Sequence, residues 1–134
     1  MTKSTVCVYF LISGDRLNPE DVTEKLAIQP TKYWVKGDPI PEKKRFRIDS
    51  CWLLSTGDEE FLDVGEQLGK ILTLLQGKKK VLVKLADEYE LDYQFNIVIK
   101  IEEGVKPAIN LDKTMIKELD ELKAGLDIDL YIYS

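Results

Sequence analysis

One uninterrupted run of apolar residues near the N-terminus, from Val6 to Ile12, constrains the fold more than any other feature of the sequence. The run is rich in β-branched and aromatic side chains, and Gly14 and Asp15 follow it as turn residues. Successive side chains of a strand point to opposite faces of a sheet, so a strand that is apolar on both faces suits the interior of a sheet. We therefore expect Val6–Ile12 to form a strand at the centre of a sheet or one buried on both faces.

Length and composition indicate one ordinary globular domain covering residues 1–134. The chain has 134 residues, of which 44% are hydrophobic and 32% charged, which is enough apolar material for one core and is not typical of disorder. No apolar run approaches the roughly 20 residues that cross a bilayer, and the first residues lack the pattern of a signal peptide. We expect a cytoplasmic protein without a membrane partner.

The charge of the chain argues against nucleic acid as a partner. The formal net charge is −5 and the isoelectric point is near 4.9, whereas proteins that bind nucleic acid usually present a basic face. An acidic surface is compatible with a basic protein partner, although acidity mostly promotes solubility. We expect no nucleic acid partner.

Capping residues and periodicity predict the elements of the first half of the chain. Asn18 offers its side-chain oxygen as an N-cap, and Pro19 suits the first position of a helix. Gly77 supplies a C-terminal stop for a later helix whose apolar residues recur every three or four positions. The expected elements are a helix over residues 19–27, an edge strand over 33–35, an exposed loop over 37–44, a long strand over 46–54 and a helix over 61–75.

The second half is expected to add a hairpin, a helix and a terminal strand. Val81–Leu85 and Gln94–Ile101 predict two antiparallel strands joined by an acidic connection. Asp112 can cap a helix, and Gly125 can accept the left-handed turn that ends it. Alternation over residues 126–132 predicts a half-buried terminal strand. The expected inward side chains of the helix are Met115, Ile116, Leu119 and Leu122, and those on the strand face opposite the buried stripe include Tyr131 and Tyr133.

These elements predict an α+β fold in the order β-α-β-β-α-β-β-α-β. Hairpins and helical crossovers occur together, so we expect a mixed, mainly antiparallel sheet with three helices on one face. The last six elements read β-α-β-β-α-β, which is the split βαβ pattern of ferredoxin-like folds.

Short motifs along most of the chain carry a family resemblance. They are Gly14 after the opening strand, Asn18 to Val22, Leu26 to Thr31, Lys36 to Asp38, Arg47, Trp52 to Ser55, Pro107 to Leu111 and Gly125 to Asp129. With these motifs the chain resembles a bacterial family known as domain of unknown function 4279. The resemblance implies a small bacterial cytoplasmic protein, and it supplies no activity, cofactor or catalytic residue.

The residue types that most often carry catalysis are missing or unsuitably placed. The chain has no histidine, which removes the commonest general base and the commonest metal ligand. Cys7 and Cys51 lie in apolar strand segments, which suits packing better than a nucleophile or a disulfide. No phosphate-binding glycine motif and no EF-hand spacing occurs, and the acidic runs are typical of solvated surface. We expect no catalytic residue, no metal and no cofactor.

The segment 32–52 holds the one candidate binding surface. Between residues 32 and 47 the chain has six cations and two carboxylates, interleaved with aromatic rings that can join cations in holding an anion or an acidic protein patch. In the competing interpretation, Trp34 and Phe46 pack inward while the lysines solvate a loop and protect an edge strand. The candidate residues are Trp34, Lys36, Gly37, Asp38, Arg45, Arg47 and Trp52, although Trp52 also suits the core.

Three functions stay open at the level of sequence. The favoured one is a non-catalytic protein-binding module of immunity type or regulatory type, which has a protein partner and is not an enzyme. The alternative is a domain that binds a small molecule or anion through residues 32–52. An enzyme built from carboxylates and Arg47 ranks last, because it requires a buried carboxyl group that sequence cannot show. An exposed edge strand would also permit a homodimer.

Overall fold

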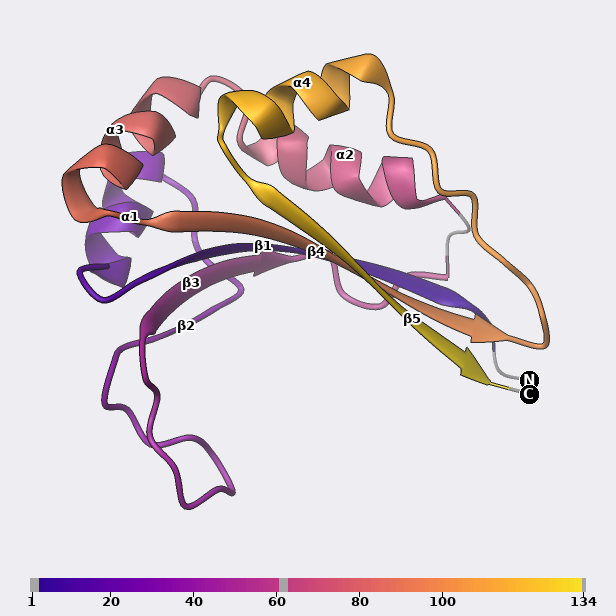
Figure 1. The fold of residues 1–134 in the computed structure, drawn as a ribbon, viewed down its shortest axis with the longest axis horizontal. Coiled ribbons are helices and arrows are strands. Elements are labelled where there is room, and N and C mark those ends of the chain that lie inside the picture. Colours follow the sequence, from indigo (N-terminus) through magenta and orange to yellow (C-terminus); the bar gives the residue numbers. More distant parts are fainter. Residues whose placement is uncertain (1–2, 61–62, 134) are drawn as a thin grey trace.

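A five-stranded sheet covered on one face by four helices forms the part of the chain that the structure describes, residues 3–60 and 63–133 of a computed structural model (Figure 1). The helices lie together above the sheet, and the lower face of the sheet carries no helix in the described residues. In chain order the elements are β1 (Thr5–Gly14), α1 (Pro19–Leu26), β2 (Lys32–Trp34), β3 (Ser50–Ser55), α2 (Val64–Leu74), α3 (Lys79–Tyr89), β4 (Asp92–Glu102), α4 (Lys113–Glu121) and β5 (Gly125–Tyr133).

β1 is the central strand, which confirms the expectation from its apolar sequence. The strand order is β2-β3-β1-β4-β5, so β1 has a hydrogen-bonded neighbour on each side. β1 runs antiparallel to β3 and β4, β2 runs antiparallel to β3, and β4 and β5 are parallel. The predicted α+β class and the mixed, mainly antiparallel sheet are confirmed.

The core lies between the sheet and the helices. Phe10 of β1 pairs with Leu54 of β3 and with Phe95 of β4, and all three side chains are buried. The rings of Phe10 and Phe95 pack at a centroid distance of 4.8 Å. Burying a large apolar side chain stabilises the fold by about 1.5–3 kcal/mol relative to exposure, so this row is a main source of stability.

Side-chain caps begin the helices where the sequence predicted them. The Asn18 side chain accepts hydrogen bonds from the backbone N–H groups of Glu20 and Asp21, and the Asp112 side chain accepts one from Met115. These bonds satisfy backbone donors that have no partner within the helix.

The predicted end and inward face of α4 need correction. Lys123, with φ 55°, adopts the left-handed conformation, whereas Gly125 is already the first residue of β5. Ile116 was expected inward but is exposed, whereas Leu119 and Leu122 are buried as expected.

The predicted strand over residues 81–85 is wrong, because this segment belongs to helix α3. Leu82 and Leu85 are buried while Lys84 is exposed, which is the three-residue spacing of a helix face and not the alternation of a strand. The Tyr93 hydroxyl donates a hydrogen bond to the Leu82 carbonyl and holds α3 against β4. The described part therefore has four helices and five strands in place of three and six. The predicted hairpin and the ferredoxin-like order of the last six elements are also wrong.

Two further strands differ from prediction. The long strand expected over residues 46–54 is shorter, since β3 begins at Ser50 and Phe46 makes only an isolated bridge to Pro39. The terminal strand was expected to be half-buried, but the apolar row of β5 is exposed on the helix side, because β5 lies at one edge of the sheet. The helix predicted over residues 61–75 begins at Val64, and residues 61 and 62 lie outside the described part.

No helix among the described residues combines the length and the apolar character needed to cross a membrane.

Replacement of Leu82 by alanine tests the assignment of α3. We expect Leu82→Ala to lower the free energy of unfolding by about 2–5 kcal/mol, because it leaves a cavity in the core. Val83→Ala should have a much smaller effect, because the Val83 side chain is only partly buried. Urea unfolding of both variants measures the difference. A cost for Val83→Ala equal to that of Leu82→Ala would contradict the helix.

Native Cys7 and Cys51 should react slowly with thiol reagents. Both are free and buried, and burial raises the pKa of Cys51 from 9.0 to about 11. The thiolate is the reactive form, so at pH 8 the folded protein presents little of it at Cys51, while burial limits access of the reagent to both side chains. Ellman's reagent should modify both thiols quickly in urea and slowly in buffer. Fast reaction of the folded protein would show that the sheet does not shield them.

Candidate functional site

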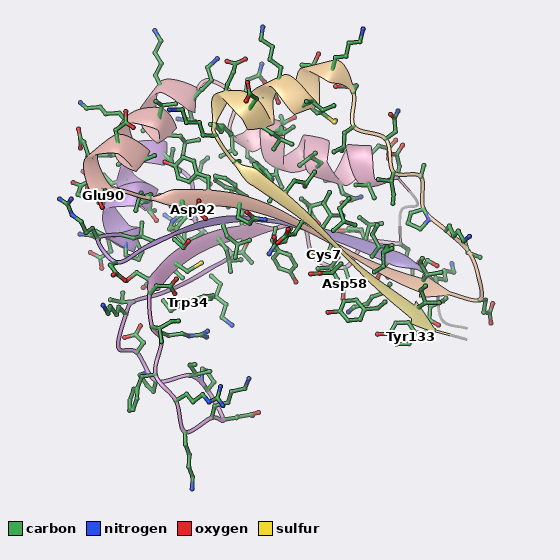
Figure 2. The ribbon with its side chains drawn as sticks, in the orientation of Figure 1. Cys7, Trp34, Asp58, Glu90, Asp92 and Tyr133 are labelled. Atoms are coloured by element: carbon green, nitrogen blue, oxygen red, sulfur yellow. The ribbon has the colours of Figure 1, made fainter. Side chains whose placement is uncertain are left out.

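The segment between β2 and β3, residues 35–49, forms an arm that projects from the sheet on the side away from the helices (Figure 1). The arm contains five of the seven candidate residues predicted from sequence. Trp34, the last residue of β2, lies where the arm leaves the sheet (Figure 2).

Backbone hydrogen bonds hold the arm in a defined conformation. The Gly37 N–H donates to the Arg47 carbonyl at 2.9 Å, and the Arg47 N–H donates to the Asp38 carbonyl at 2.8 Å. Further out, the Ile40 N–H donates to the Arg45 carbonyl at 3.0 Å. The two sides of the arm are therefore joined to each other, and the arm is a folded projection.

Gly37 and Asp38 form the turn at the base of the arm. The Asp38 carboxylate accepts a hydrogen bond from the Val35 N–H at 2.9 Å, and the Asp38 N–H donates to the Val35 carbonyl at 2.9 Å. Gly37 has φ 93°, a backbone conformation that is strained for residues with a side chain. These two candidate residues shape the arm.

Trp34 and Arg47 form the contact between the sheet and the arm. The Arg47 guanidinium lies 3.9 Å from the centroid of the Trp34 ring, within the range of a cation–π interaction. Trp34 pairs with Cys51 of β3. The pKa of the Cys51 thiol is raised overall, chiefly by burial and further by Asp49, while Arg47 acts in the opposite direction and lowers it. Arg47 and Trp34 therefore attach the arm to the sheet.

Trp52 is separated from the other candidate residues. It pairs with Ile12 and Tyr33 on the helix side of the sheet, has no exposed surface, and donates its indole N–H to the Thr23 hydroxyl at 2.9 Å. Trp34 pairs with Cys51, the residue before Trp52 in β3, so its ring lies on the opposite face of the sheet. Trp52 therefore belongs to the core and not to the candidate surface.

The remaining cations lie on the outside of the arm. Lys36 is at its base, where its ammonium group lies 3.7 Å from the Asp15 carboxylate and its backbone N–H donates to the Ser50 hydroxyl at 2.9 Å. Arg45 is exposed beside Lys43 and Lys44. Over residues 35–49 there are five cations and three carboxylates, in a chain with a net charge of −5.

Exposed apolar side chains on the arm are the feature that the sequence analysis missed. Phe46 is 66% exposed and Ile48 is 84% exposed, and Val35 is exposed as well. The competing interpretation, in which Phe46 packs inward, is therefore wrong for this residue. Pro39 and Pro41 lie on the opposite side of the arm, and proline lacks the N–H that a strand ladder requires. These two prolines were the sequence signal that residues 46–49 do not continue the sheet.

Two cavities among the described residues lie away from the arm. One cavity of about 430 Å³ lies between α1 and β2, with Thr23 and Tyr33 among its lining residues. Another of about 600 Å³ lies among α2, α3 and α4. Neither includes Trp34, Lys36, Arg45 or Arg47. Within residues 3–60 and 63–133, no three His, Cys, Asp or Glu side chains are grouped to hold a metal ion.

Comparison with known proteins identifies the family. No curated protein and no solved structure matches the chain. A family model described as domain of unknown function DUF4279 matches residues 2–133. That match covers nearly the whole sequence, and the chain belongs to the DUF4279 family.

Proposed function

We propose that this chain is a non-catalytic binding module of the bacterial cytoplasm, of immunity type or regulatory type, and that its arm binds an acidic protein surface. The observation that carries the proposal is the exposure of Phe46 and Ile48, 66% and 84%, on a segment whose backbone is hydrogen bonded. A large exposed apolar side chain is unremarkable when it is single. Two of them on one projecting, ordered segment favour contact with a partner.

The charge of the arm supports an acidic partner. Lys43, Lys44 and Arg45 are consecutive and exposed beside Phe46. Arginine and aromatic side chains are enriched at the centres of protein interfaces, and a local positive patch speeds encounter with a negative one. The rest of the chain is acidic, so the attraction would also orient the molecule with its arm toward the partner.

The geometry gives less support to the alternative of a small-ligand site. Such a site requires side chains that converge in a concave pocket. Trp34 and Trp52 lie on opposite faces of the sheet, and the outer cations of the arm lie on a projection. An enzymatic role for Arg47 receives no support either, because its guanidinium stacks on Trp34 and no buried carboxyl group is seen beside it in the described residues.

Replacement of two adjacent residues on the arm tests the proposal. Wild-type protein and the variant Arg45→Glu with Phe46→Ser are each used to capture partners from cells of the natural host, with quantitative mass spectrometry as the readout. We expect wild-type protein to recover one stoichiometric acidic protein and the variant to recover at least ~10-fold less.

The matched control changes the same kinds of side chain on α4. The variant Ile116→Ser with Lys117→Glu likewise replaces an exposed apolar residue and the adjacent cation. It should recover the partner as wild-type protein does. Equal recovery by the arm variant and wild-type protein, or absence of a stoichiometric partner for wild-type protein, would reject the proposal.

Asp38→Ala tests whether the shape of the arm contributes to binding. The change removes the carboxylate that accepts from the Val35 N–H and leaves the exposed apolar and cationic side chains in place. We expect weaker binding, because the arm must then be ordered when the partner binds. Hydrogen exchange should be faster at the Val35 amide in the free variant. Faster exchange with unchanged affinity would show that preorganisation of the arm is unimportant.

A further inference from the structure

β5 has a free edge in the described part of the structure. It pairs with β4 on one side and is the last strand in the sheet order, so backbone N–H and C=O groups along its other side have no strand partner there. Every residue from Gly125 to Tyr133 is exposed. Leu130 is 54% exposed and Ile132 is 75% exposed, although both lie on the helix side of the sheet.

The opposite edge of the sheet differs from β5 in the way it is protected. β2 has only three residues, follows Pro30, and has Lys32 within it and Lys36 just beyond it. Short length, proline and lysine are the usual means by which an edge strand avoids further pairing. β5 has nine residues and contains neither lysine nor proline. Its two charged residues, Asp127 and Asp129, lie on the face away from the helices, so its length and its apolar row suit continued strand pairing.

We infer that two copies of this chain associate through β5, as antiparallel neighbours related by a two-fold axis at Leu130. A two-fold axis perpendicular to the sheet keeps the helix sides of both copies on the same side. Each apolar row then continues into the apolar row of the second copy. The result is one sheet of ten strands, since each copy contributes five, which is within the size that open sheets reach.

The side chains of β5 favour the register in which the two β5 strands pair about Leu130. On the helix side it places Leu130 opposite Leu130 of the second copy, and Ile128 opposite Ile132. On the other side it places Asp129 opposite Tyr131 and Asp127 opposite Tyr133, so no two carboxylates are directly opposed. Like charges directly opposite in an antiparallel pair are destabilising, whereas apolar pairs stabilise it.

Neighbouring registers are less favourable. An axis at Asp129 places this carboxylate opposite Asp129 of the second copy. An axis at Ile128 places Asp127 opposite Asp129 of the second copy. An axis at Tyr131 avoids both conflicts but opposes fewer residues of the two strands. This complementarity to itself is why a second copy, and not a different protein, is the occupant that β5 fits.

The dimer does not depend on the proposed function of the arm. β5 and β2 are at opposite edges of the sheet, so the two arms would lie near the two outer ends of the joined sheet and remain free. Figure 2 likewise shows Tyr133 and Trp34 far apart along the sheet. Loss of partner binding and loss of dimerisation can therefore be measured separately.

Charge substitutions at the axis test the inference on the full chain. Sedimentation velocity is measured for wild-type protein, Leu130→Lys, Leu130→Glu, and an equimolar mixture of the two variants. We expect a wild-type dimer, and self-association at least ~10-fold weaker for each variant alone, because like charges face each other at the axis. The mixture should form dimers again, because a lysine then faces a glutamate.

Ile48→Lys provides the matched control, since it places the same charge at an exposed isoleucine far from β5 and should leave the dimer unchanged. A wild-type protein that stays monomeric at concentrations up to about 100 µM would overturn the inference, because the dissociation constant of a dimer would then be weaker than that concentration. So would a Leu130→Lys variant that dimerises as wild-type protein does. A mixture that stays monomeric would overturn the axis at Leu130.

Hydrogen exchange gives a second readout that uses wild-type protein alone and does not depend on whether a variant folds. Amides of β5 that point away from β4 should exchange more slowly as protein concentration rises, because pairing with the second copy protects them. Exchange of β5 that is independent of concentration, across a range in which sedimentation shows a dimer, would place the interface elsewhere and overturn the inference.

Discussion

The two-sided pairing of β1 is the constraint on which the rest of the structure depends. β1 is hydrogen bonded to β3 on one side and to β4 on the other. Its residues Val6, Val8, Phe10 and Ile12 are buried under the helices. A strand held in this way cannot slip by one residue without turning its buried row to the other face. The register of β1 therefore sets which side chains of β3 and β4 enter the core.

The same arrangement leaves two different surfaces at the two edges of the sheet. Beyond β3, the short strand β2 leads into the arm, where cations and exposed apolar side chains lie on a hydrogen-bonded projection. Beyond β4, β5 is long, exposed and free on one side in the described residues. The core thus fixes the centre of the sheet, while the exposed apolar and charged features are at its edges, where burial does not restrict the choice of residues.

Sequence predicted elements best where local chemistry specifies them. The N-caps Asn18 and Asp112 and the central strand β1 were found because a cap and an apolar run need only neighbouring residues. The segment 81–85 was mistaken for a strand, because a short apolar run fits either period and only packing of Leu82 and Leu85 decides between them. Five of the seven residues of the candidate surface lie on the arm, whereas Trp52 belongs to the core.

The sequence by itself determined the α+β class, the central strand, the exposed and cationic character of the segment after β2, and the family resemblance. These properties depend on residue types and on spacing within a few positions. Only the tertiary structure decided that Trp34 and Trp52 lie on opposite faces, that Phe46 and Ile48 are exposed, and that β5 ends the sheet. Strand register and strand order determine these three outcomes, and both arise from contacts between residues far apart in the chain.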